Sequence, residues 1–534
     1  MKDFKDLRMH DQNEVYHMIR KGATRRDLLK WFGAAGMSAA VAGPLTLSAT
    51  RAYADTPKKG GHLRVSSYAQ SSTDAMDPAK FTYTNDYVRA YTNYDTLVDL
   101  DEVVNPQPRL ATEWEVSDDG TLWSLKLREG VTFHDGKTFS SADVVWSLMR
   151  HKDEELGSTG KALMDGVESV TADGPNRVNI QLSGPNADFI RVLGLYNFAI
   201  AAEGTTDFSN GNGTGPMVVK EFTPGVNTLY ERNENYFGNV YVDSCDFFAI
   251  TDGVARVNAL LSGEIDLGMQ IPANGLQSVE SSAETQVFNI PAPAWTTLNM
   301  KVDSGPFANK DFRNAIKYMF DRDRLIKTSF KNYAVKANDH PFHPSSPYYN
   351  ADLPQRDLDL DKAKSLIKSS GMEGSTIDLH ISDAVGASSD MALMLQQGAA
   401  RSGINVNIKR EPADGYWSNI WLKRDFYASN WNARPVYDVI LSIAFGSGAK
   451  WNETNFANER VDALIVEARG ETDEAKRKEL YGEVQAILYE DDGHMTPLFY
   501  DFIDGIRNNV KGLKKTPLGF ASGFNFANKV WLDT

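Results

Sequence analysis

The stretch that decides the fold runs from Leu110 to Leu148 and reads LATEWEVSDDGTLWSLKLREGVTFHDGKTFSSADVVWSL. After the Asp118–Gly120 turn, apolar and polar residues alternate from Trp123 to Arg128, a pattern typical of a strand with one buried face. One of the two serines at 140–141 can cap the helix predicted over 142–148. This stretch is therefore predicted to build the fold, as a strand followed by turns and a helix.

Length and composition exclude several classes of protein. With 534 residues, the chain exceeds what one hydrophobic core usually organises, so two or three packed lobes are expected. The net charge of −15 argues against a nucleic acid or an anionic membrane surface as partner. Cys245 is the only cysteine, which excludes a disulfide framework and a cysteine-ligated metal cluster within one chain.

Strand and helix patterns are interspersed along the rest of the chain. Alternating apolar residues predict strands at 178–182 and 404–408. Apolar residues at helical spacing predict helices at 312–320 and 480–488. Because no period of 20 to 50 residues recurs, a solenoid or a propeller is not expected. The pattern indicates an α/β class with several sheets.

The first 54 residues have the layout of a twin-arginine export signal. Thr24–Lys30 contains the arginine pair, Trp31–Ala49 is weakly apolar and rich in small residues, and Arg51–Ala54 ends in a small-x-small cleavage site. The apolar stretch is too weak for a lasting membrane span. We therefore expect a periplasmic protein that begins at Asp55 and is not inserted in the membrane.

Several ordered blocks resemble one family, the extracellular solute-binding proteins of the dipeptide, oligopeptide and nickel type (family 5), which serve ATP-driven importers. The block at 110–148 is the strongest of them, and the similarity extends over nearly the whole mature chain. The other blocks are Gly60–Val65, Met76–Pro78, Gly213–Pro216, Ala255–Pro272, Phe312–Leu325, Asp361–Gly371 and Arg460–Asp491.

The resemblance implies an α/β, two-lobed periplasmic binding protein fold of type II, in the large cluster with an extra subdomain. Mixed sheets flanked by helices would be joined by a two-strand hinge, with crossings near Pro293–Met300 and Thr496–Tyr500. Hinge closure around a ligand is the mechanism of such proteins. The expected divisions are the signal at 1–54, lobe I at 55–290 and 500–534 with a subdomain at about 100–210, and lobe II at 291–499.

Motifs of catalysis are missing from the sequence. There is no Gly-x-Ser-x-Gly elbow, no His-Glu-x-x-His and no phosphate-binding loop. His340 and His343, beside Asp339, lack the further ligands and the regular helix of a metal site, which favours a surface loop. Cys245 lies among acidic and aromatic residues and is expected to be inert. We predict a non-enzymatic protein with no cofactor and no metal.

The segment from Asn430 to Asp438 mixes polar, aromatic and proline residues without a regular period, as a loop does. The resemblance places here, in peptide-binding members, an Asp that pairs with the ligand's free amino group, and Arg434 stands in that position. A guanidinium favours a carboxylate or phosphate through two parallel hydrogen bonds. The alternative is that Arg434 pairs with Asp438 and braces the loop.

Further candidate contacts surround Arg434 or border the expected cleft. Trp431 and Tyr437 flank it and offer aromatic faces, and Trp295 falls at the first crossing. Asp86 could receive a ligand amine, although turn capping explains Asn85 and Asp86 equally well. The complete set of predicted ligand-binding residues is Arg434, Trp431, Tyr437, Asn432, Trp295, Tyr83, Asn85, Asp86 and Trp417.

These observations predict the substrate-binding component of an ABC importer, a monomer that encloses a small peptide or an amino-acid-derived zwitterion and delivers it to the permease's transmembrane subunits. The same fold binding a nickel chelate, an opine, a glutathione-like compound or an oligosaccharide is an alternative. An envelope hydrolase is an alternative of another class, as is a sensory or peptide-chaperoning role.

Overall fold

The computed structural model describes residues 4, 7, 9–20, 23–35, 37, 41–42, 44–46, 56–69, 71, 74–413 and 415–533. Helices and strands are interspersed over these residues, and the strands form one eleven-stranded sheet and three smaller sheets. The large sheet contains both parallel and antiparallel pairs, for example β1 with β10 and β9 with β10. The predicted mixed α/β class is therefore confirmed.

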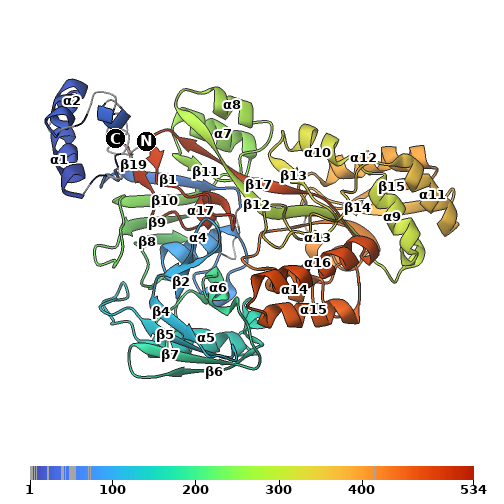
Figure 1. Cartoon of the computed structure of the whole chain (residues 1–534), viewed down its shortest axis with the longest axis horizontal. Helices are drawn as coiled ribbons and strands as arrows, with labels where there is room; N and C mark the ends of the chain where they lie inside the picture. The colour runs from blue at the N-terminus through green and yellow to red at the C-terminus, as the bar shows by residue number, and fades with distance from the viewer. Residues whose placement is uncertain are drawn as a thin grey trace.

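The large sheet runs across the whole molecule (Figure 1). Its strands follow the order β15-β14-β16-β12-β17-β11-β1-β10-β9-β8, and β13 pairs with β17 beside this path. The bounds are β1 (His62–Ser67), β8 (Met217–Thr223), β9 (Asn227–Arg232), β10 (Ser244–Ala249), β11 (Leu267–Gly268), β12 (Thr285–Met300), β13 (Ala334–Lys336), β14 (Thr376–Ile381), β15 (Asn405–Arg410), β16 (Phe426–Trp431) and β17 (His494–Arg507).

The two longest strands, β12 and β17, lie side by side in the middle of this sheet. They pair in antiparallel fashion, and their register shifts between Ile290 and Ala294. Pro291 and Pro293 fall in this interval, and neither has an amide hydrogen to donate to the ladder. One end of β12 pairs with β16, while the far end of β17 pairs with β11. The pair therefore connects the two ends of the sheet.

Two apolar cores meet β12 and β17 from opposite ends. The first core draws on residues 63–294 and 502–532, together with Ala433. The second draws on residues 298–498. Both strands thus leave one core and enter the other within a few residues, inside the segments that the sequence indicates as crossings. The sheet is continuous, but the packing on it is divided.

A separate four-stranded sheet has the order β4-β5-β7-β6 and packs against α5. The sheet and this helix contribute to a separate apolar core. Along β5, Trp123, Leu125 and Leu127 are buried while Ser124 and Lys126 are not, which confirms the alternation predicted there. Ser140 is the N-cap of α5 and forms a capping box with Asp143. The bounds are β2 (Val98–Leu100), β3 (Pro106–Pro108), β4 (Ala111–Val116), β5 (Leu122–Leu127), β6 (Val167–Ala172), β7 (Arg177–Leu182), α5 (Ser141–Met149) and α6 (Phe189–Val192).

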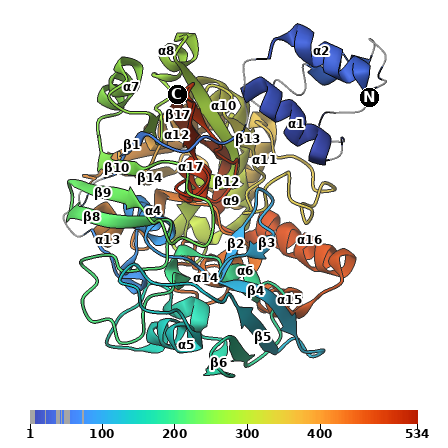
Figure 2. The ribbon, with the colours of Figure 1, turned by 90° about the vertical axis from the view of Figure 1, so that its left-hand side faces the viewer.

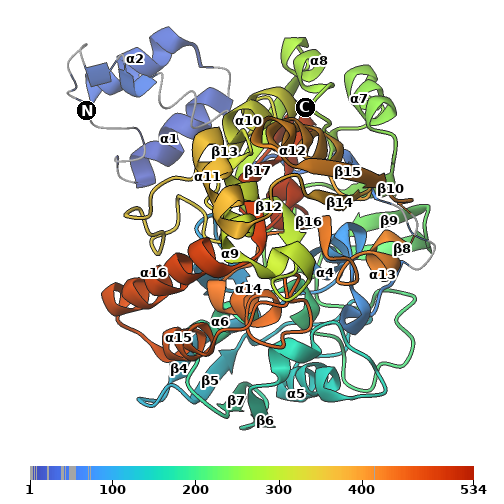
Figure 3. The same ribbon diagram turned by 90° about the vertical axis from the view of Figure 1, so that its right-hand side faces the viewer.

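Helices cover the large sheet, and α14, α15 and α16 form a group beside the four-stranded sheet (Figure 3). The longer helices have amphipathic sequences whose buried residues enter the cores described above. The bounds are α4 (Thr84–Thr92), α7 (Gly253–Ser262), α8 (Leu276–Ser281), α9 (Lys310–Tyr318), α10 (Arg322–Ser329), α11 (Leu360–Ser370), α12 (Ser388–Ser402), α13 (Tyr416–Asn419), α14 (Tyr437–Ala444), α15 (Glu459–Gly470), α16 (Glu474–Asp491) and α17 (Phe520–Gly523), with the short strands β18 (Val510–Lys511) and β19 (Trp531–Leu532).

The N-terminal helices α1 (Met9–Arg20) and α2 (Arg25–Ala34) form a small unit at the edge of the molecule (Figure 2). The arginine pair begins α2, and Thr24 caps this helix in a reciprocal capping box with Asp27. The predicted cleavage site at Arg51–Ala54 lies outside the described residues. Among the residues that are described, no helix combines the length and the apolar character that a membrane crossing requires.

Candidate solute-binding site

The loop that carries Arg434 emerges from the middle of the large sheet. Trp431 is the last residue of β16 and pairs with Trp295 of β12, so both side chains lie on the same face of the sheet. Their rings stack with centroids 6.0 Å apart and planes 19° apart, and Phe499 of β17 meets Trp295 edge-on. Both indoles are buried. A rigid aromatic base therefore supports the residues that follow Trp431.

Arg434 is half-buried above this base. Its Nη1 donates to the carbonyl oxygens of Asn432 at 3.2 Å and Ala433 at 3.3 Å, and its Cζ lies 5.9 Å from the centre of the Trp431 ring. In the described part of the chain, no carboxylate forms an ion pair with it. Asp438 pairs with Arg469 at 2.9 Å instead. The guanidinium is therefore oriented by backbone oxygens and left without a neutralising charge.

Tyrosines from a distant part of the chain pack in the same apolar cluster as Ala433, the residue before Arg434. Tyr87 of α4 stacks on Tyr196 with ring centroids 3.7 Å apart and meets Phe524 edge-on. Burial and Tyr196 raise the pKa of the Tyr87 hydroxyl, and the positive charge of Arg434 opposes this rise. Ala433 and Tyr87 belong to one apolar cluster, so the loop after β16 and helix α4 pack together, although 347 positions separate Arg434 from Tyr87. Tyr87 and Tyr196 are only half-buried, so part of each ring stays open to solvent.

A second group of aromatic residues lies beside β17. We call these residues, together with Tyr87, Tyr196 and Phe524, the aromatic wall. Tyr68 follows β1 and meets Phe520 edge-on, with ring centroids 5.4 Å apart. Phe520 packs on Phe502, which in turn contacts Tyr500. Tyr68 and Tyr500 are half-buried. These rings, which come from both ends of the chain, belong to the same apolar cluster as Ala433 and Tyr87.

Asp504 of β17 lies beside this aromatic wall and is fully buried. Its Oδ2 accepts the amide N–H of Ala521 at 2.6 Å, and its Oδ1 has no hydrogen-bond partner among the described residues. Ala521, Ser522 and Phe524 all have positive φ, a conformation that non-glycine residues adopt only under strain. Burial raises the pKa of Asp504 to about 7. This carboxyl group and its strained loop were not indicated by any local sequence pattern.

The predicted residues near α4 have partners within the protein. Both oxygens of Asp86 accept backbone N–H groups, from Ala75 at 3.2 Å and Thr82 at 3.0 Å, and Arg89 lies 3.1 Å away. Asn85 donates to the carbonyl of Ala69. Tyr83 is the N-cap of α4, and its hydroxyl is buried without a partner. Asn85 and Asp86 are thus engaged within the protein, and Tyr87, the next residue, packs in the cluster that contains Ala433.

The remaining predicted residues lie in different parts of the structure. Tyr437 begins α14 rather than lying in the loop, and it stacks on Phe342 with ring centroids 4.1 Å apart. Asn432 is exposed next to Arg434. Trp417 is 42% exposed in the short helix α13, where it meets Trp421 edge-on. The structure thus brings together Arg434, Trp431 and Trp295, places Tyr437 against the apolar cluster that contains both indoles, and leaves Trp417 outside this cluster.

Metal and cavity features lie away from this site. No group of three or more His, Cys, Asp or Glu side chains among the described residues is arranged to hold a metal ion. His340 and His343 are buried rather than on the surface loop expected, and burial lowers the pKa of each to about 4. An open depression of about 420 Å³ lies over α5, lined in part by Trp146 and Met149.

Comparisons with known proteins agree with this architecture. Residues 105–453 match the family described as bacterial extracellular solute-binding proteins, family 5 Middle. Heme-binding protein A of Haemophilus influenzae is 26% identical over 455 residues, which cover 78% of this chain and 82% of that protein. The glutathione-binding protein GsiB of Escherichia coli O1:K1 / APEC is 26% identical over 478 residues, covering 85% of this chain and 92% of that one.

Solved structures of similar fold include the ABC transporter-associated periplasmic binding protein DppA from Helicobacter pylori in complex with the peptide STSA. Its TM-score is 0.79 at 25% identity, and the alignment covers 89% of this chain and 99% of that one. The family match spans well over half of the chain, and the cores, the long strand pair and the mixed sheet accord with it. This chain belongs to the bacterial extracellular solute-binding proteins of family 5, and it is a binding protein rather than an enzyme.

Proposed function

We propose that this protein is the periplasmic substrate-binding component of an ABC importer and that it captures a small peptide or an amino-acid-derived solute by its carboxylate. The observation that carries the proposal is the half-buried guanidinium of Arg434, which directly follows Ala433 of the apolar cluster that contains the aromatic wall and has no carboxylate partner among the described residues. A buried or half-buried charge without a counter-charge is unfavourable unless a ligand supplies one. A bidentate carboxylate is the group that fits a guanidinium best.

Two lobes enclose the solute in this proposal. Lobe I comprises about 55–290 and 500–534 with its subdomain at about 100–210, and lobe II comprises 291–499. The change of core along β12 and β17 supports this division. Short strand crossings of this kind permit hinge closure, and a solute that contacts both lobes stabilises the closed form.

Contacts across the proposed boundary support a closed arrangement. Arg477 of α16 forms a buried ion pair with Asp188, which precedes α6 in the subdomain. Val436 and Val439, from lobe II, are part of the subdomain's apolar core. In this closed form the loop that carries Arg434 lies between the lobes, as solute capture requires. The solute leaves unchanged when the lobes open at the permease.

The relatives support a carboxylate-bearing solute without fixing which one. The proteins similar to this chain are described as binding heme, glutathione and a peptide. These compounds differ in size and shape, but each carries at least one free carboxylate. The order of the N-terminal segment further supports twin-arginine export to the periplasm, where such proteins meet their solutes.

A thermal-shift screen of the mature chain tests the proposal. The panel contains dipeptides, glutathione, amino-acid derivatives, betaines, an opine, metal–histidine chelates and an oligosaccharide. A bound solute at one hundred times its Kd adds about 2.7 kcal/mol of stability, a shift that is easily measured. We expect stabilisation by a carboxylate-bearing compound and none by its amide or ester. Stabilisation by a neutral oligosaccharide alone would refute the carboxylate proposal, and turnover of any panel compound would refute a purely binding role.

A further inference from the structure

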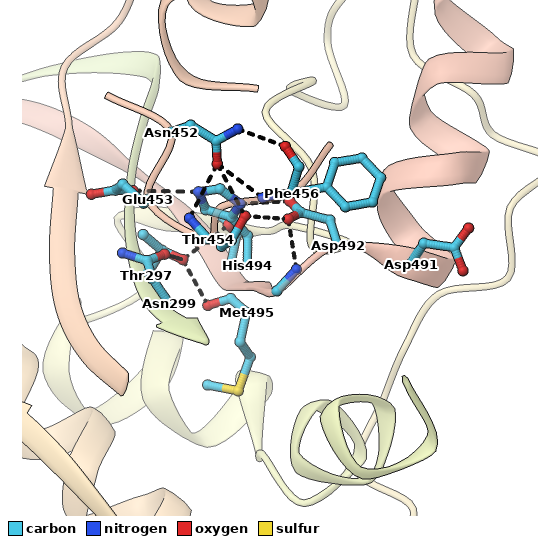
Figure 4. A network of polar contacts seen from close by, with 12 residues as sticks. Thr297, Asn299, Asn452, Glu453, Thr454, Phe456, Asp491, Asp492, His494 and Met495 are labelled. Carbon is cyan, nitrogen blue, oxygen red and sulfur yellow. Dashed lines mark hydrogen bonds and ion pairs between the residues drawn. The ribbon is translucent and has the colours of Figure 1, made fainter. Parts of the chain in front are cut away.

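A buried polar cluster that includes Glu453, Asp492 and His494 lies at the start of β17 (Figure 4), and Glu453 connects it to the Trp431 indole. It consists of Glu453, Asp492, His494 and Lys317, which we call the Glu453 cluster. None of these four side chains is more than 1% exposed. They come from the loop between α14 and α15, the C-cap of α16, the first position of β17 and helix α9. Such a concentration of buried charge is unfavourable unless every member is paired.

Glu453 holds two tryptophans through their indole N–H groups. Its Oε2 accepts from Nε1 of Trp431 at 2.8 Å, and its Oε1 accepts from Nε1 of Trp421 at 2.5 Å. The hydroxyl of Tyr427 donates to its backbone carbonyl at 2.8 Å. The two oxygens of one carboxylate therefore fix the orientation of Trp431, whose ring lies under the Arg434 guanidinium.

His494 supplies the positive charge that Glu453 requires. Its Nε2 lies 3.3 Å from Glu453 Oε2, and its Nδ1 lies 2.5 Å from Asp492 Oδ2. Burial lowers the pKa of His494, but the Asp492 and Glu453 carboxylates outweigh this and raise it to about 9. Lys317 Nζ donates to the Asp492 carbonyl at 2.8 Å, and Thr454 donates to the Asp492 carboxylate at 2.7 Å. His494 is thus positively charged at neutral pH.

We propose that Glu453 is a positioning residue of the solute site: its carboxylate, held by His494, fixes the Trp431 indole and so the surface on which Arg434 meets its ligand. The proposal rests on the proposed function, because it assigns Glu453 a role in binding without contact with the solute. It also joins the site to the hinge, since His494 begins β17 and the ring partner of Trp431 belongs to β12. A change in either strand is therefore transmitted to the base of Arg434.

The chemistry of the pair explains why a carboxylate occupies this position. Two indole N–H donors converge on the side chain, and an indole cannot accept a hydrogen bond in return. A carboxylate offers an acceptor to each donor, whereas a carboxamide offers one acceptor and one NH₂ group that opposes the second donor. Glu453→Gln therefore preserves size and removes the clamp on one tryptophan, together with the charge that balances His494.

The first experiment needs no ligand. The indole N–H resonances of ¹⁵N-tryptophan-labelled protein are recorded for wild type and Glu453→Gln, with Trp421→Phe and Trp431→Phe used only for assignment. We expect the Trp421 and Trp431 resonances to move in Glu453→Gln, because a hydrogen bond to a carboxylate strongly shifts an indole proton, while Trp114 in the four-stranded sheet stays in place. An unmoved Trp431 resonance would overturn the proposal.

The second experiment measures affinity by calorimetry with L-alanyl-L-alanine and glutathione as probes. We expect Glu453→Gln to bind about 10- to 100-fold more weakly than wild type, because a hydrogen bond to a charged group has been lost. Val461→Ala is the matched control: it truncates a fully buried side chain of α15 and lowers stability without contacting Glu453. It should bind within twofold of wild type.

The outcomes separate this proposal from the proposed function. If Glu453→Gln binds within twofold of wild type, or if Val461→Ala loses as much affinity as Glu453→Gln, the role of Glu453 is merely structural. Either result refutes the positioning role. Failure of wild type to bind either probe would count against the solute class proposed above. In that case the indole resonances decide alone: a moved Trp431 signal supports the clamp, and an unmoved one refutes it.

Discussion

Two arginines of the proposed lobe II reach the boundary with lobe I, and they differ in what neutralises them. Arg477 of α16 forms an ion pair with Asp188 of the subdomain, and both side chains are buried. Arg434 lies at the same boundary and is oriented only by two carbonyl oxygens, with no carboxylate partner among the described residues. Arg477 therefore has its counter-charge within the protein, whereas Arg434 has none among the described residues.

The difference teaches how a binding site is distinguished from scaffold in a chain rich in buried charge. Arg322 and Arg356 share Asp339, and Arg89 is held by Asp74 and Asp86. These arginines follow the rule that buried charges are paired. Arg256 and Arg313 are buried with only carbonyl oxygens as hydrogen-bond acceptors among the described residues. Arg434 differs from these two because it is only half-buried and lies where segments of both proposed lobes meet, a place where a functional site is expected.

Removal of the unpaired charge should have the largest effect. Arg434→Ala should weaken binding of the solute found in the screen by about 2 to 5 kcal/mol, roughly 30-fold to several thousand-fold. The melting temperature of the empty protein should stay the same, because no ion pair is broken. Calorimetry and thermal unfolding measure the two effects. Arg424→Ala, an exposed arginine of the same proposed lobe, is the control, and equal loss in both variants would contradict the comparison.

Asp504 is the opposite case, a buried carboxyl group without a cation. Its pKa of about 7 in the folded protein exceeds the ordinary value of 3.8, so folding favours the protonated form. The contribution of protonated Asp504 to the free energy of unfolding is fully present below pH 3.8, and it is lost as the pH rises through 7. Asp504→Asn keeps an acceptor for Ala521 and removes this loss. It should be more stable than wild type by about 2 to 4 kcal/mol at pH 8, with a smaller gain at pH 5.

Urea denaturation at the two pH values checks this. The control is Asp383→Asn, which removes an exposed carboxylate and should show no difference in stability between pH 5 and pH 8. If wild type loses no stability relative to Asp504→Asn between pH 5 and pH 8, the expectation is wrong. Asp504 then has a cationic partner or is solvated.

The paired arginine should have a smaller effect on binding. Asp188→Asn removes the charge opposite Arg477 and, because Arg477 becomes solvated when the lobes open, acts mainly on the closed form. We expect affinity to fall by about 1 to 2 kcal/mol, roughly 5- to 30-fold. Small-angle scattering of the empty protein should shift toward a larger radius. A loss of global stability with unchanged affinity would instead show that the pair belongs to the scaffold.

The fold could be predicted from the sequence because its signals are local. The strand after the Asp118–Gly120 turn and the Ser140 cap each depend on a few neighbouring residues, and the structure has both. The export role of the N-terminal segment stays a prediction from residue order, and its expected cleavage site lies outside the described residues. Where short-range patterns fix an element, a single sequence is sufficient.

The candidate site could be predicted only in part because its wall is assembled from distant segments. Arg434 and Trp431 stand out within one loop, and Trp295 within one predicted crossing. Tyr68, Tyr87, Tyr196 and Tyr500 carry no local mark, because they meet only through the pairing of β1, β12 and β17 with their neighbours. The loop expected to include Tyr437 ends at Val436, because Tyr437 begins α14 and its ring stacks on Phe342; its role in binding stays a prediction.

The smallest effect is expected at Trp417, which tests how far the aromatic cluster belongs to the site. Its ring is 42% exposed, and Trp421 and Trp451 lie between it and Trp431 in the series of ring contacts. Trp417→Phe should therefore change affinity by less than about 0.5 kcal/mol, as surface substitutions usually do. Calorimetry with the solute from the screen measures this, with Trp431→Phe beside it. A tenfold loss would extend the ligand surface along the whole row of indoles and would make the exposed end, rather than Arg434, the place where the solute first binds.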